Sequence, residues 1–588
     1  MIDTAAAGKV LVAKKGDVKA PGPDPITGET LPQYFNRRDV NLKQDQLSFL
    51  QHWRDLSKYL LPRSSRFFVS DKNQLGNRRN TAIINNTGTL ALRTLSAGMM
   101  SGITSPSRPW FNLRTHNTAL NKNQAVKVWL DDVRNLMSET FLKSNLYTTL
   151  PVVYEDLGCF GTSAFALMED DEDVIRCYMF PIGSYTLSIG PRGNVNGCFR
   201  EFEMTVAQLV AQFGIDNCSD FVQSQFKTKN LDTGIRVKHV IEENPDSMDG
   251  MLDSKFLPFR SVYYEMKETT KVLEYKGTHE FAVMAPRWRV TGEDTWGNAP
   301  AMDVLGDVAQ LQQMEKRKLQ AIDMLITPPR NVPAELRNEY IGTLANEMTF
   351  IPSNATGAKV EPSYVINPNI QYIGGEIQLV MQRIRKGLFE DLFLMIAEID
   401  KSGVTATEIQ ARQQEKMMAM GPVLERLNDE MLDPIVRRTY SILERAGMIP
   451  TPPPELQGQP IVIEYISIMA QAMKLQGVVG VERLVGFIGG ISAQRPDALD
   501  KLNTDEVIDA YADMVGVPPN LVNDSEIVGK IRDARQKQEA QAQQMAQLQQ
   551  SAQTAKVMAD TQTSSPSMLQ IMAGAAQQAG PLLSQAGQ

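Results

Sequence analysis

The sequence has 588 residues, of which 42% are hydrophobic and 22% charged, so it has the composition of a folded globular protein and the length of two to four domains. Its net charge of -8 excludes a protein that grips nucleic acid over its whole surface, because such binding needs an excess of Lys and Arg. Four cysteines without CxxC or zinc-ligand spacing favour a reducing compartment and no disulfide framework. The first residues lack a signal-peptide core and no window holds about 18 consecutive apolar residues, so we expect a chain that is neither exported nor membrane-spanning.

The N-terminal part predicts a flexible arm followed by three helices. Residues 1–40 are rich in Gly, Pro and Asp, which is typical of a loose segment. Helical periodicity then predicts helices over 41–61, 87–103 and 123–147. The apolar face of the first is expected to hold Leu47, Leu50, Trp53, Leu56 or Ser57, and Leu60. That of the third is expected to hold Val126, Trp129, Val133, Met137 and Phe141.

Between the second and third helices, "SGITSPSRPWFNLRT" predicts a stiff corner. Pro106 and Pro109 remove backbone donors and push the residues before them out of the helical region. Trp110 and Phe111 then offer a large apolar anchor that can hold the corner on neighbouring helices. The alternative is that Trp110 stacks on a nucleic-acid base. We favour the anchor, because stacking platforms usually lie in basic grooves.

From about 174 to 290 the pattern changes to β. Alternation in 184–189, turn formers and a second strand at 198–204 predict a hairpin. A short helix should follow, with Thr205 and Gln208 as its capping box and Gly214 as its end. Further strands are predicted at the ranges 261–267, 271–275 and 281–290. The fold class is therefore α+β and mainly helical.

Two long helical runs dominate the next part. Each can hold about 26 helical residues, or about 39 Å. Proline-containing residues between them predict a small subdomain at the tip of a helical hairpin. After the second run, Thr405 and Glu408 form a capping box that begins another helix, which Gly421 and Pro422 should kink or divide. Helical segments should continue to about residue 534, followed by a Gln/Ala-rich helix and a mobile tail.

No motif for catalysis occurs in the sequence. The phosphate-binding GxxxxGK[ST] loop, GxGxxG, HExxH and GxSxG are all missing. The four histidines are scattered along the chain, and the acidic runs are typical of solvated surface. We therefore expect no catalytic residue, no metal site and no cofactor.

Several unusual strings occur together and in order, among them "NNTGTLALRTLSAGMMSGITSPSRPWFNL", "VYEDLGCFGTSAFALMEDDED", "FREFEMTVAQLVAQFG" and "TATEIQARQQEKMMAMGPVLERLNDEMLDPIVRRTYSILERAGMIP". They resemble the portal, or head-to-tail connector, proteins of short-tailed, podovirus-type bacteriophages. The resemblance covers about residues 40–530. It implies a ring of twelve copies at one capsid vertex, through which DNA is packaged and later ejected.

The resemblance also implies a portal-type fold with wing, stem, clip and crown regions. The implied order is arm 1–40, wing 41–299, first stem helix 300–327, clip 328–373, second stem helix 374–399, tunnel loop 400–404, a long kinked helix of wing or crown 405–447, crown 448–534, and C-terminal helix with tail 535–588. The tunnel loop would consist of Asp400, Lys401, Ser402, Gly403 and Val404.

The implied partners are the homododecamer itself, the terminase large subunit, the major capsid and scaffolding proteins, tail adaptor proteins and double-stranded DNA of any sequence, with no membrane. The implied location is the portal vertex of the virion, after assembly in the host cytoplasm. Twelve copies at -8 each carry -96, which would mostly repel DNA and favour a low-friction channel.

Two basic clusters interrupt this acidic background. They are Lys316, Arg317 and Lys318 in the first long helical run, and Arg383, Arg385 and Lys386 in the second. Both lie in elements that the resemblance places around the channel, which makes them candidates for a DNA-facing ring. Solvent exposure or ion pairing with neighbouring subunits is the favoured alternative, because most charge runs are solvated faces.

Two other functions remain open at this point. A virion scaffold or structural protein would assemble without a central pore, and a DNA-processing enzyme would show metal-dependent turnover. The enzyme is the less favoured of the two, because the sequence offers no motif for its chemistry.

Overall fold

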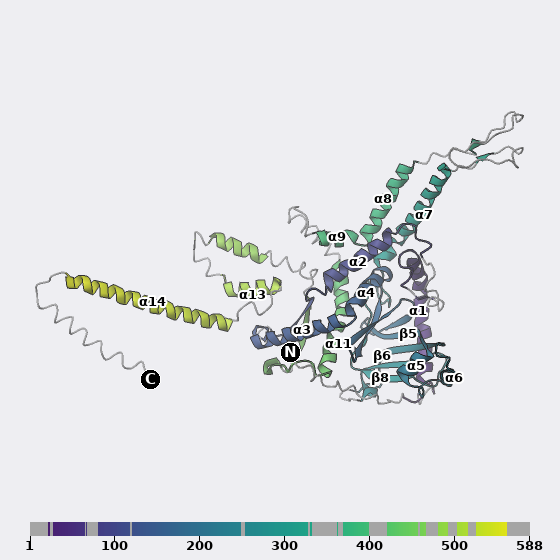
Figure 1. The fold of residues 1–588 in the computed structure, drawn as a ribbon, viewed down its shortest axis with the longest axis horizontal. Helices are drawn as coiled ribbons and strands as arrows, with labels where there is room; N and C mark the ends of the chain where they lie inside the picture. Colours follow the sequence, from purple (N-terminus) through teal and green to yellow (C-terminus); the bar gives the residue numbers. More distant parts are fainter. Residues whose placement is uncertain are drawn as a thin grey trace.

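The fold was analysed in a computed structural model (Figure 1). It describes residues 21–23, 28–64, 66–67, 80–117, 120–248, 253–326, 330–331, 361–362, 369–398, 420–456, 459–465, 480–491, 495, 502–515 and 525–560. A body of helices and two main sheets carries a projecting helical hairpin and, on another side, the C-terminal helices. The expected α+β class is confirmed.

The larger sheet has five antiparallel strands in the order β4-β5-β6-β7-β8. The strands are β4 (Tyr185–Ile189), β5 (Val195–Thr205), β6 (Gly234–Glu243), β7 (Phe259–Glu265) and β8 (Glu274–Thr278). The predicted hairpin is confirmed as the β4–β5 pair. Strand β6 was not predicted.

Helices cover both faces of this sheet. Helix α5 (Val206–Phe213) starts at the predicted capping box, in which Gln208 N donates to Thr205 Oγ1 over 3.3 Å. With α6 (Asp220–Lys227), it buries apolar side chains against Val237 of β6. The N-terminal half of α1 (Leu31–Tyr59) buries Phe35 on the opposite face. Successive side chains of a strand alternate between faces, so one sheet serves two cores.

The main core lies where a second sheet, of order β3-β2-β9, meets the helices. Its strands are β2 (Ala164–Asp170), β3 (Val174–Phe180) and β9 (Val283–Met284). The helices of this core include the C-terminal half of α1, α2 (Thr87–Ile103), α3 (Gln124–Lys143) and α4 (Leu146–Phe160), and later helices of the chain add further residues. The short turns η3 (Leu120–Lys122) and η4 (Ser254–Phe256) lie in connections. The expected apolar face of the third predicted helix is confirmed, because all five of its residues are buried.

Helix α1 begins ten residues before the predicted helix, so the expected arm is too long. Thr30 and Gln33 form a capping box, and a proline stands in the first turn where no backbone donor is needed. The predicted apolar face is wrong at Leu47, which is 60% exposed, whereas Trp53 and Leu56 are fully buried.

The predicted third helix is also divided, because Asn145 lies between α3 and α4. Its side chain bridges to β3: Asn145 Nδ2 donates to the carbonyl of Cys177 over 2.8 Å, and Cys177 N donates to Asn145 Oδ1 over 2.7 Å. The side-chain amide of Asn145 is therefore bonded to the backbone of β3 at the point where the helix is divided.

The proline-rich corner leads into a strand. Strand β1 (Phe111–Thr115) pairs antiparallel with β12 (Ile461–Tyr465), from almost 350 residues further along the chain. Trp110 and Phe111 are buried, with exposed fractions of 2% and 0%. A base-stacking role for Trp110 would need an open ring face, and the structure leaves none.

Two long helices form the projecting hairpin. Helix α7 (Pro300–Ile326) closely matches the predicted first run, and α8 (Ile370–Gly387) starts before residue 374 because the Asn369 side chain caps it. The prediction that the second run, 374–399, is one continuous helix is wrong. It breaks at Phe389, whose φ is 57°, and α9 (Glu390–Glu398) follows in a new direction. Strands β10 (Arg330–Asn331) and β11 (Glu361–Pro362) pair between the two long helices.

The C-terminal part departs from the predicted boundaries. Residues 420–427 are helical, and a π-helical turn (Asn428–Leu432), α11 (Asp433–Arg445) and the turn η7 (Pro454–Leu456) follow. Strand β12 then interrupts the expected helical region. Helices α13 (Thr504–Val515) and α14 (Ser525–Asp560) come last, and α14 runs through the boundary predicted at residue 535. The kink expected at Gly421 and Pro422 stays a prediction, because residues 401–419 lie outside the described part.

Asp156 on α4 is a buried acid in the main core, and among the described residues its Oδ1 has no hydrogen-bond partner. Burial, together with the charge of Glu155, holds the pKa of this carboxyl well above its ordinary value. The unfolded chain loses the proton near pH 3.9, so above that pH the folded state binds more protons and is destabilised as the pH rises.

Asp156→Asn should therefore raise the free energy of unfolding increasingly above about pH 4, by up to about 1.4 kcal/mol per pH unit. Urea denaturation of the variant and the parent protein at pH 5 and pH 8 measures this. Asp45→Asn, at an exposed position of α1, is the matched control and should leave the pH profile unchanged. Parallel profiles for Asp156→Asn and the parent protein would contradict the prediction.

Candidate functional site

The helical hairpin is the element that carries both predicted basic clusters (Figure 1). Its base is fixed by apolar contacts between the two helices. The buried residues are Val304, Val308 and Leu311 of α7 and Ile377, Val380 and Ile384 of α8. Gly387 lies so close to Val304 that a Cβ at this position would overlap the valine side chain. This glycine permits the close approach with which α8 ends.

The basic residues of α8 are mostly paired within the chain. Arg383 Nη2 lies 2.9 Å from Asp307 Oδ1 on α7, which ties the two helices together. Arg385 Nε lies 3.4 Å from Glu390 Oε2 across the break between α8 and α9. Both arginine side chains remain about half exposed. Lys386 is exposed and forms no ion pair with any described residue.

The basic residues of α7 form a second group, which lies nearer to the tip of the hairpin. Lys318 Nζ lies 3.5 Å from Glu315 Oε2, and Arg317 Nη1 donates to Gln320 Oε1 over 3.2 Å. Lys316 is exposed and has no ion-pair partner among the described residues. In each cluster one lysine thus has no ion-pair partner within the part of the chain that the structure describes.

The two clusters do not meet in one patch. The Arg383–Asp307 bridge sets the register of the hairpin, and Lys316 lies nine residues beyond Asp307 on α7. At 1.5 Å per residue the clusters are about 14 Å apart along the helix axis. Copies arranged around a common axis would carry two separate basic levels.

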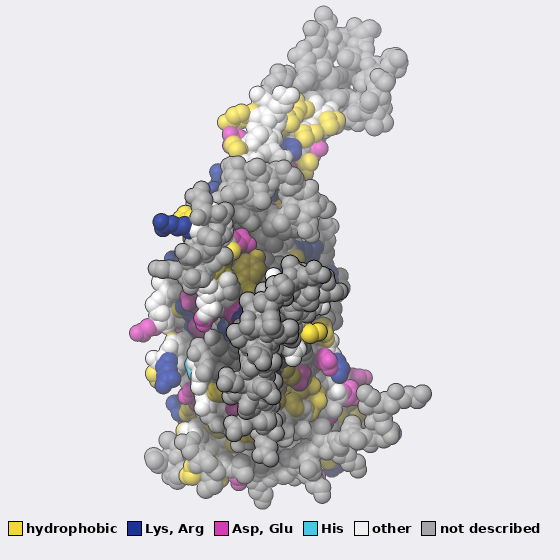
Figure 2. Space-filling model, turned by 90° about the vertical axis from the view of Figure 1, so that its left-hand side faces the viewer, with side chains coloured by type: hydrophobic (Ala, Val, Ile, Leu, Met, Phe, Trp, Pro, Cys, Tyr) yellow, Lys and Arg dark blue, Asp and Glu magenta, His cyan; other side chains and the backbone are white. Residues whose placement is uncertain are grey.

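The hairpin also exposes large apolar side chains that nothing in the described chain covers. Figure 2 shows hydrophobic side chains at the surface of this projecting part. The exposed residues are Leu319, Met324, Leu325, Ile326, Tyr372 and Leu379. Such a concentration on a projecting element marks an interaction surface rather than ordinary solvated surface.

Comparison with known proteins places the chain in a family. Residues 34–522 match the family described as bacteriophage head to tail connecting protein. The chain belongs to this family. Among curated proteins, the portal protein of Salmonella phage epsilon15 is 45% identical over 550 residues, which make up 93% of this chain and 99% of that relative. The probable portal protein of Bordetella phage BPP-1 is 39% identical over 529 residues, or 90% and 95% of the two chains. The resemblance to phage portal proteins is confirmed.

The sequence analysis missed the break between α8 and α9. Phe389 adopts a left-handed conformation that is uncommon for a residue with a side chain. Beyond it, Phe393 of α9 packs on Gly98 of α2, where a Cβ would overlap the phenylalanine ring. The string "KGLFED" carried a signal, since Gly387 ends one helix and the acidic Glu390 and Asp391 begin another. The predicted tunnel loop, 400–404, lies outside the described residues.

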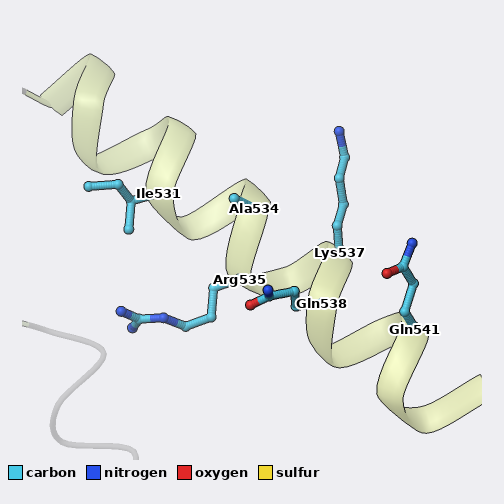
Figure 3. Close-up of a pocket in the computed structure, with 6 residues that line it drawn as sticks. All are labelled: Ile531, Ala534, Arg535, Lys537, Gln538 and Gln541. Atoms are coloured by element: carbon cyan, nitrogen blue, oxygen red, sulfur yellow. The ribbon is translucent and has the colours of Figure 1, made fainter. Parts of the chain in front are cut away.

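The described residues were searched for groups that could hold a metal ion and for hollows that could hold a small molecule. Among the described residues, no group of three or more His, Cys, Asp or Glu side chains can hold a metal ion. A shallow hollow of about 540 Å³ lies on α14, and the described residues that line it are Ile531, Ala534, Arg535, Lys537, Gln538 and Gln541 (Figure 3). Within the described ranges, no helix is both long and apolar enough to cross a membrane.

Proposed function

We propose that this head-to-tail connecting protein forms a closed ring of twelve copies at one capsid vertex. The ring is the channel for genome packaging by the terminase, for genome retention and ejection, and the attachment site of the tail. The observation that carries the proposal is the family match over 34–522. The uncovered apolar surface of the α7–α8 hairpin supports it, because identical subunits can bury that surface against one another.

The C-terminal helices support assembly for the same reason. Among the described residues from 480 to 560 no side chain is buried, although this part contains many apolar residues. Those exposed by more than a third include Leu484, Phe487, Ile491, Ile508, Tyr511 and Ile531. A helix whose apolar residues face water gains little stability from its own chain, so neighbouring copies are the natural cover.

A channel for DNA must let the duplex slide. The net charge of -8 per copy opposes tight binding to phosphates. On the hairpin, internal ion pairs partly neutralise Arg383, Arg385 and Lys318, which leaves a weak basic character at two levels. This arrangement suits brief, sequence-independent contact with passing DNA.

The proposed partners follow from this role. They are the terminase large subunit, the major capsid and scaffolding proteins and the tail adaptor proteins, at the portal vertex of the virion after assembly in the host cytoplasm. We propose no catalytic activity and no cofactor. A scaffold without a pore and a DNA-processing enzyme are the alternatives.

The deciding experiment measures the mass of the purified protein and images its particles. Light scattering should give about twelve times the chain mass of 65.4 kDa, and negative-stain images should show rings with a central pore. A stable monomer or twofold dimer would contradict the ring, and particles without a pore would favour the scaffold. Metal-dependent turnover of DNA would favour the enzyme.

Replacing Arg383, Arg385 and Lys386 together by glutamine should leave rings intact and change DNA retention after packaging. The two ion pairs that are lost are half exposed, and such pairs contribute less than about 1 kcal/mol each to stability. The effect on DNA should fade as salt rises, because it is a contact with phosphate. Packaged genome length and leakage at two salt concentrations measure it.

A matched control replaces Arg37, Arg437 and Lys276 by glutamine. These three side chains are also exposed and ion-paired, but they lie on the body rather than on the hairpin. Their loss should leave DNA retention unchanged. If the hairpin variant instead fails to form rings, its basic residues are interface contacts and the DNA-facing interpretation is wrong.

A further inference from the structure

Strand β12 has an edge that faces away from its partner β1. On β1, Thr115 N donates to Asn121 Oδ1 over 2.8 Å, and Asn121 Nδ2 donates to the carbonyl of Thr115 over 2.9 Å. Thr115 therefore makes no ladder bond with Ile461, the residue opposite it. Bonded and non-bonded pairs alternate along an antiparallel ladder. The backbone N–H and C=O groups of Ile461, Ile463 and Tyr465 thus all point away from β1.

These outward groups have no partner in the described part of the chain, where no hydrogen bond reaches them. None of the five residues of β12 is buried, whereas alternate residues of β1 are. A row of unpaired backbone groups at a sheet edge is a template for another strand. A two-stranded ribbon is also marginal by itself, so a third strand here would stabilise it.

The other long edge strands carry side chains or turns that bond to their outer edge. Asn145 bonds to both backbone groups of Cys177 on β3. Gly277 N of β8 donates to a serine hydroxyl of the turn η4, and Gln46 of α1 donates to the carbonyl of Tyr185 on β4. Such bonds keep foreign strands from pairing with an edge. Among the described strands of five or more residues, β12 is the one edge strand without such a bond.

The N-terminal segment contains a run that fits this edge. Residues 9–13, "KVLVA", are rich in strand-forming residues and lie outside the described part. Two similar runs, 348–351 and 363–366, belong to the chain between α7 and α8, which leaves and rejoins those helices at the far end of the hairpin (Figure 1). A third, 466–469, follows β12 directly, and no Gly, Pro, Asn or Asp occurs before Gly477 to turn the chain back.

The N-terminal run can reach β12 within one copy. Thr30 Oγ1 donates to the carbonyl of Thr269, which fixes the start of α1 beside the five-stranded sheet. The 29 residues of α1 cover about 44 Å from there to the main core. Residues 14–29 span up to about 55 Å when extended, so the tether is longer than this helix. A strand tethered to the same copy also has a high effective concentration at its site.

We propose that residues 9–13 pair antiparallel with the free edge of β12 in the same copy and form the third strand of this sheet. Opposed residues in a ladder share a face. Ile461 and Ile463 pack on the main core, and the pairing places Val12 and Val10 opposite them, on that apolar face. The proposal does not depend on the proposed ring.

Charge selects the antiparallel direction. In this direction Lys9 lies opposite Glu464, whose side chain is 22% exposed and meets Arg114 of β1 on its other side. In the parallel direction, with the valines on the same face, Ala13 lies there instead. Opposite charges that face each other across a ladder are favourable, which gives the antiparallel pairing a contact that the parallel one lacks.

Hydrogen exchange of single amides tests the pairing. In the full chain, the outward amides of Ile461, Ile463 and Tyr465 should exchange at least about tenfold more slowly than in a variant that lacks residues 2–20. The inward amides of the same strand bond to β1 and are the internal reference, which should be equally slow in both proteins. A synthetic peptide of residues 8–15, added in excess to the deletion variant, should slow the outward amides again.

Val10→Lys with Val12→Lys should expose the outward amides as the deletion does, because it places two charges on the face that packs on the core. Ala5→Lys with Ala7→Lys is the matched control, since it adds the same charges at the same spacing outside the run. It should exchange like the parent protein. A thermal melt shows that each variant is folded.

Three results would overturn the pairing. Outward amides that exchange equally fast with and without the N-terminal segment would show that it does not cover the edge. Amides that stay slow in the deletion variant or in the double-lysine variant would show that another segment covers it. Slow exchange confined to assembled particles would show that the strand comes from a neighbouring copy. Because the unassembled chain suffices for the measurement, a failure of the proposed ring would leave this test intact.

Discussion

Replacing Trp110 by alanine should lower the free energy of unfolding by about 3–5 kcal/mol, the usual cost of removing a buried tryptophan. The indole is 2% exposed and stacks on Phe141 of α3 and Tyr465 of β12, with ring centres 5.8 Å and 6.5 Å apart. Its Nε1 also donates to the hydroxyl of Tyr147 on α4 over 3.1 Å. One side chain thus joins three elements that are distant in sequence, and urea denaturation measures its contribution.

Trp110→Phe is the control that separates packing from the hydrogen bond. It keeps a ring against Phe141 and loses the N–H donor, so about 1–2 kcal/mol is expected from the lost bond and the smaller ring. DNA affinity of assembled particles should not change in either variant. Unchanged stability together with weaker DNA binding would favour the base-stacking alternative.

The corner also shows how far local sequence carries a prediction. Pro106 and Pro109 restrict the backbone by themselves, so an extended break and its aromatic anchor followed from a few neighbouring residues. The strand that starts at Phe111 did not follow, because its partner β12 lies far along the chain. A two-stranded ribbon is marginal alone, and tertiary contacts such as the packing of Tyr465 against Trp110 and the burial of Phe111 and Leu113 in the main core stabilise it.

For the hairpin too, the features that one segment determines were predicted, and those that depend on distant contacts were not. Helical periodicity located the two long helices, α7 and α8. It missed the break between α8 and α9, because the left-handed Phe389 depends on where α9 finds room against Gly98 of α2. Periodicity is a property of one segment, and this contact joins residues almost 300 positions apart.

The basic residues were found from the sequence, but their partners were not. Asp307 and Glu390 neutralise Arg383 and Arg385 because α7 and α8 pack in one register and α9 turns back. Charge runs in a sequence carry no information on register.

Replacing Glu430 by alanine should destabilise the protein by about 3–5 kcal/mol, because it leaves a buried arginine without its counter-charge. Arg287 is 2% exposed, and its Nη2 lies 2.7 Å from Glu430 Oε1. The backbone N–H of Arg287 donates to Glu430 Oε2 over 2.9 Å as well. Further donors of this guanidinium reach the carbonyls of Gly193 and Asp294, so one pair fixes two loops to the helix.

Local helix geometry explains how Glu430 reaches this position. It lies in the π-helical turn Asn428–Leu432, and a π turn shifts the side chains after it relative to an α-helix, often at a site with a specific task. The carboxylate is thereby held against the guanidinium of Arg287, which comes from the segment just after β9. The same turn precedes α11, so loss of the pair should loosen the junction between this helix and the sheet β3-β2-β9.

Arg426→Ala is the matched control, because Arg426 Nη1 lies 3.0 Å from the same Glu430 Oε1 but its side chain is 36% exposed. An exposed pair contributes less than about 1 kcal/mol, so this variant should unfold at nearly the urea concentration of the parent protein. Glu430→Gln keeps the shape and two polar atoms without the charge. Its loss in free energy of unfolding should therefore fall between those of Glu430→Ala and Arg426→Ala. If Glu430→Ala costs no more than Arg426→Ala, the buried pair does not hold the helix in place, and the apolar contacts of Met431 and Leu432 in the main core are enough to do so.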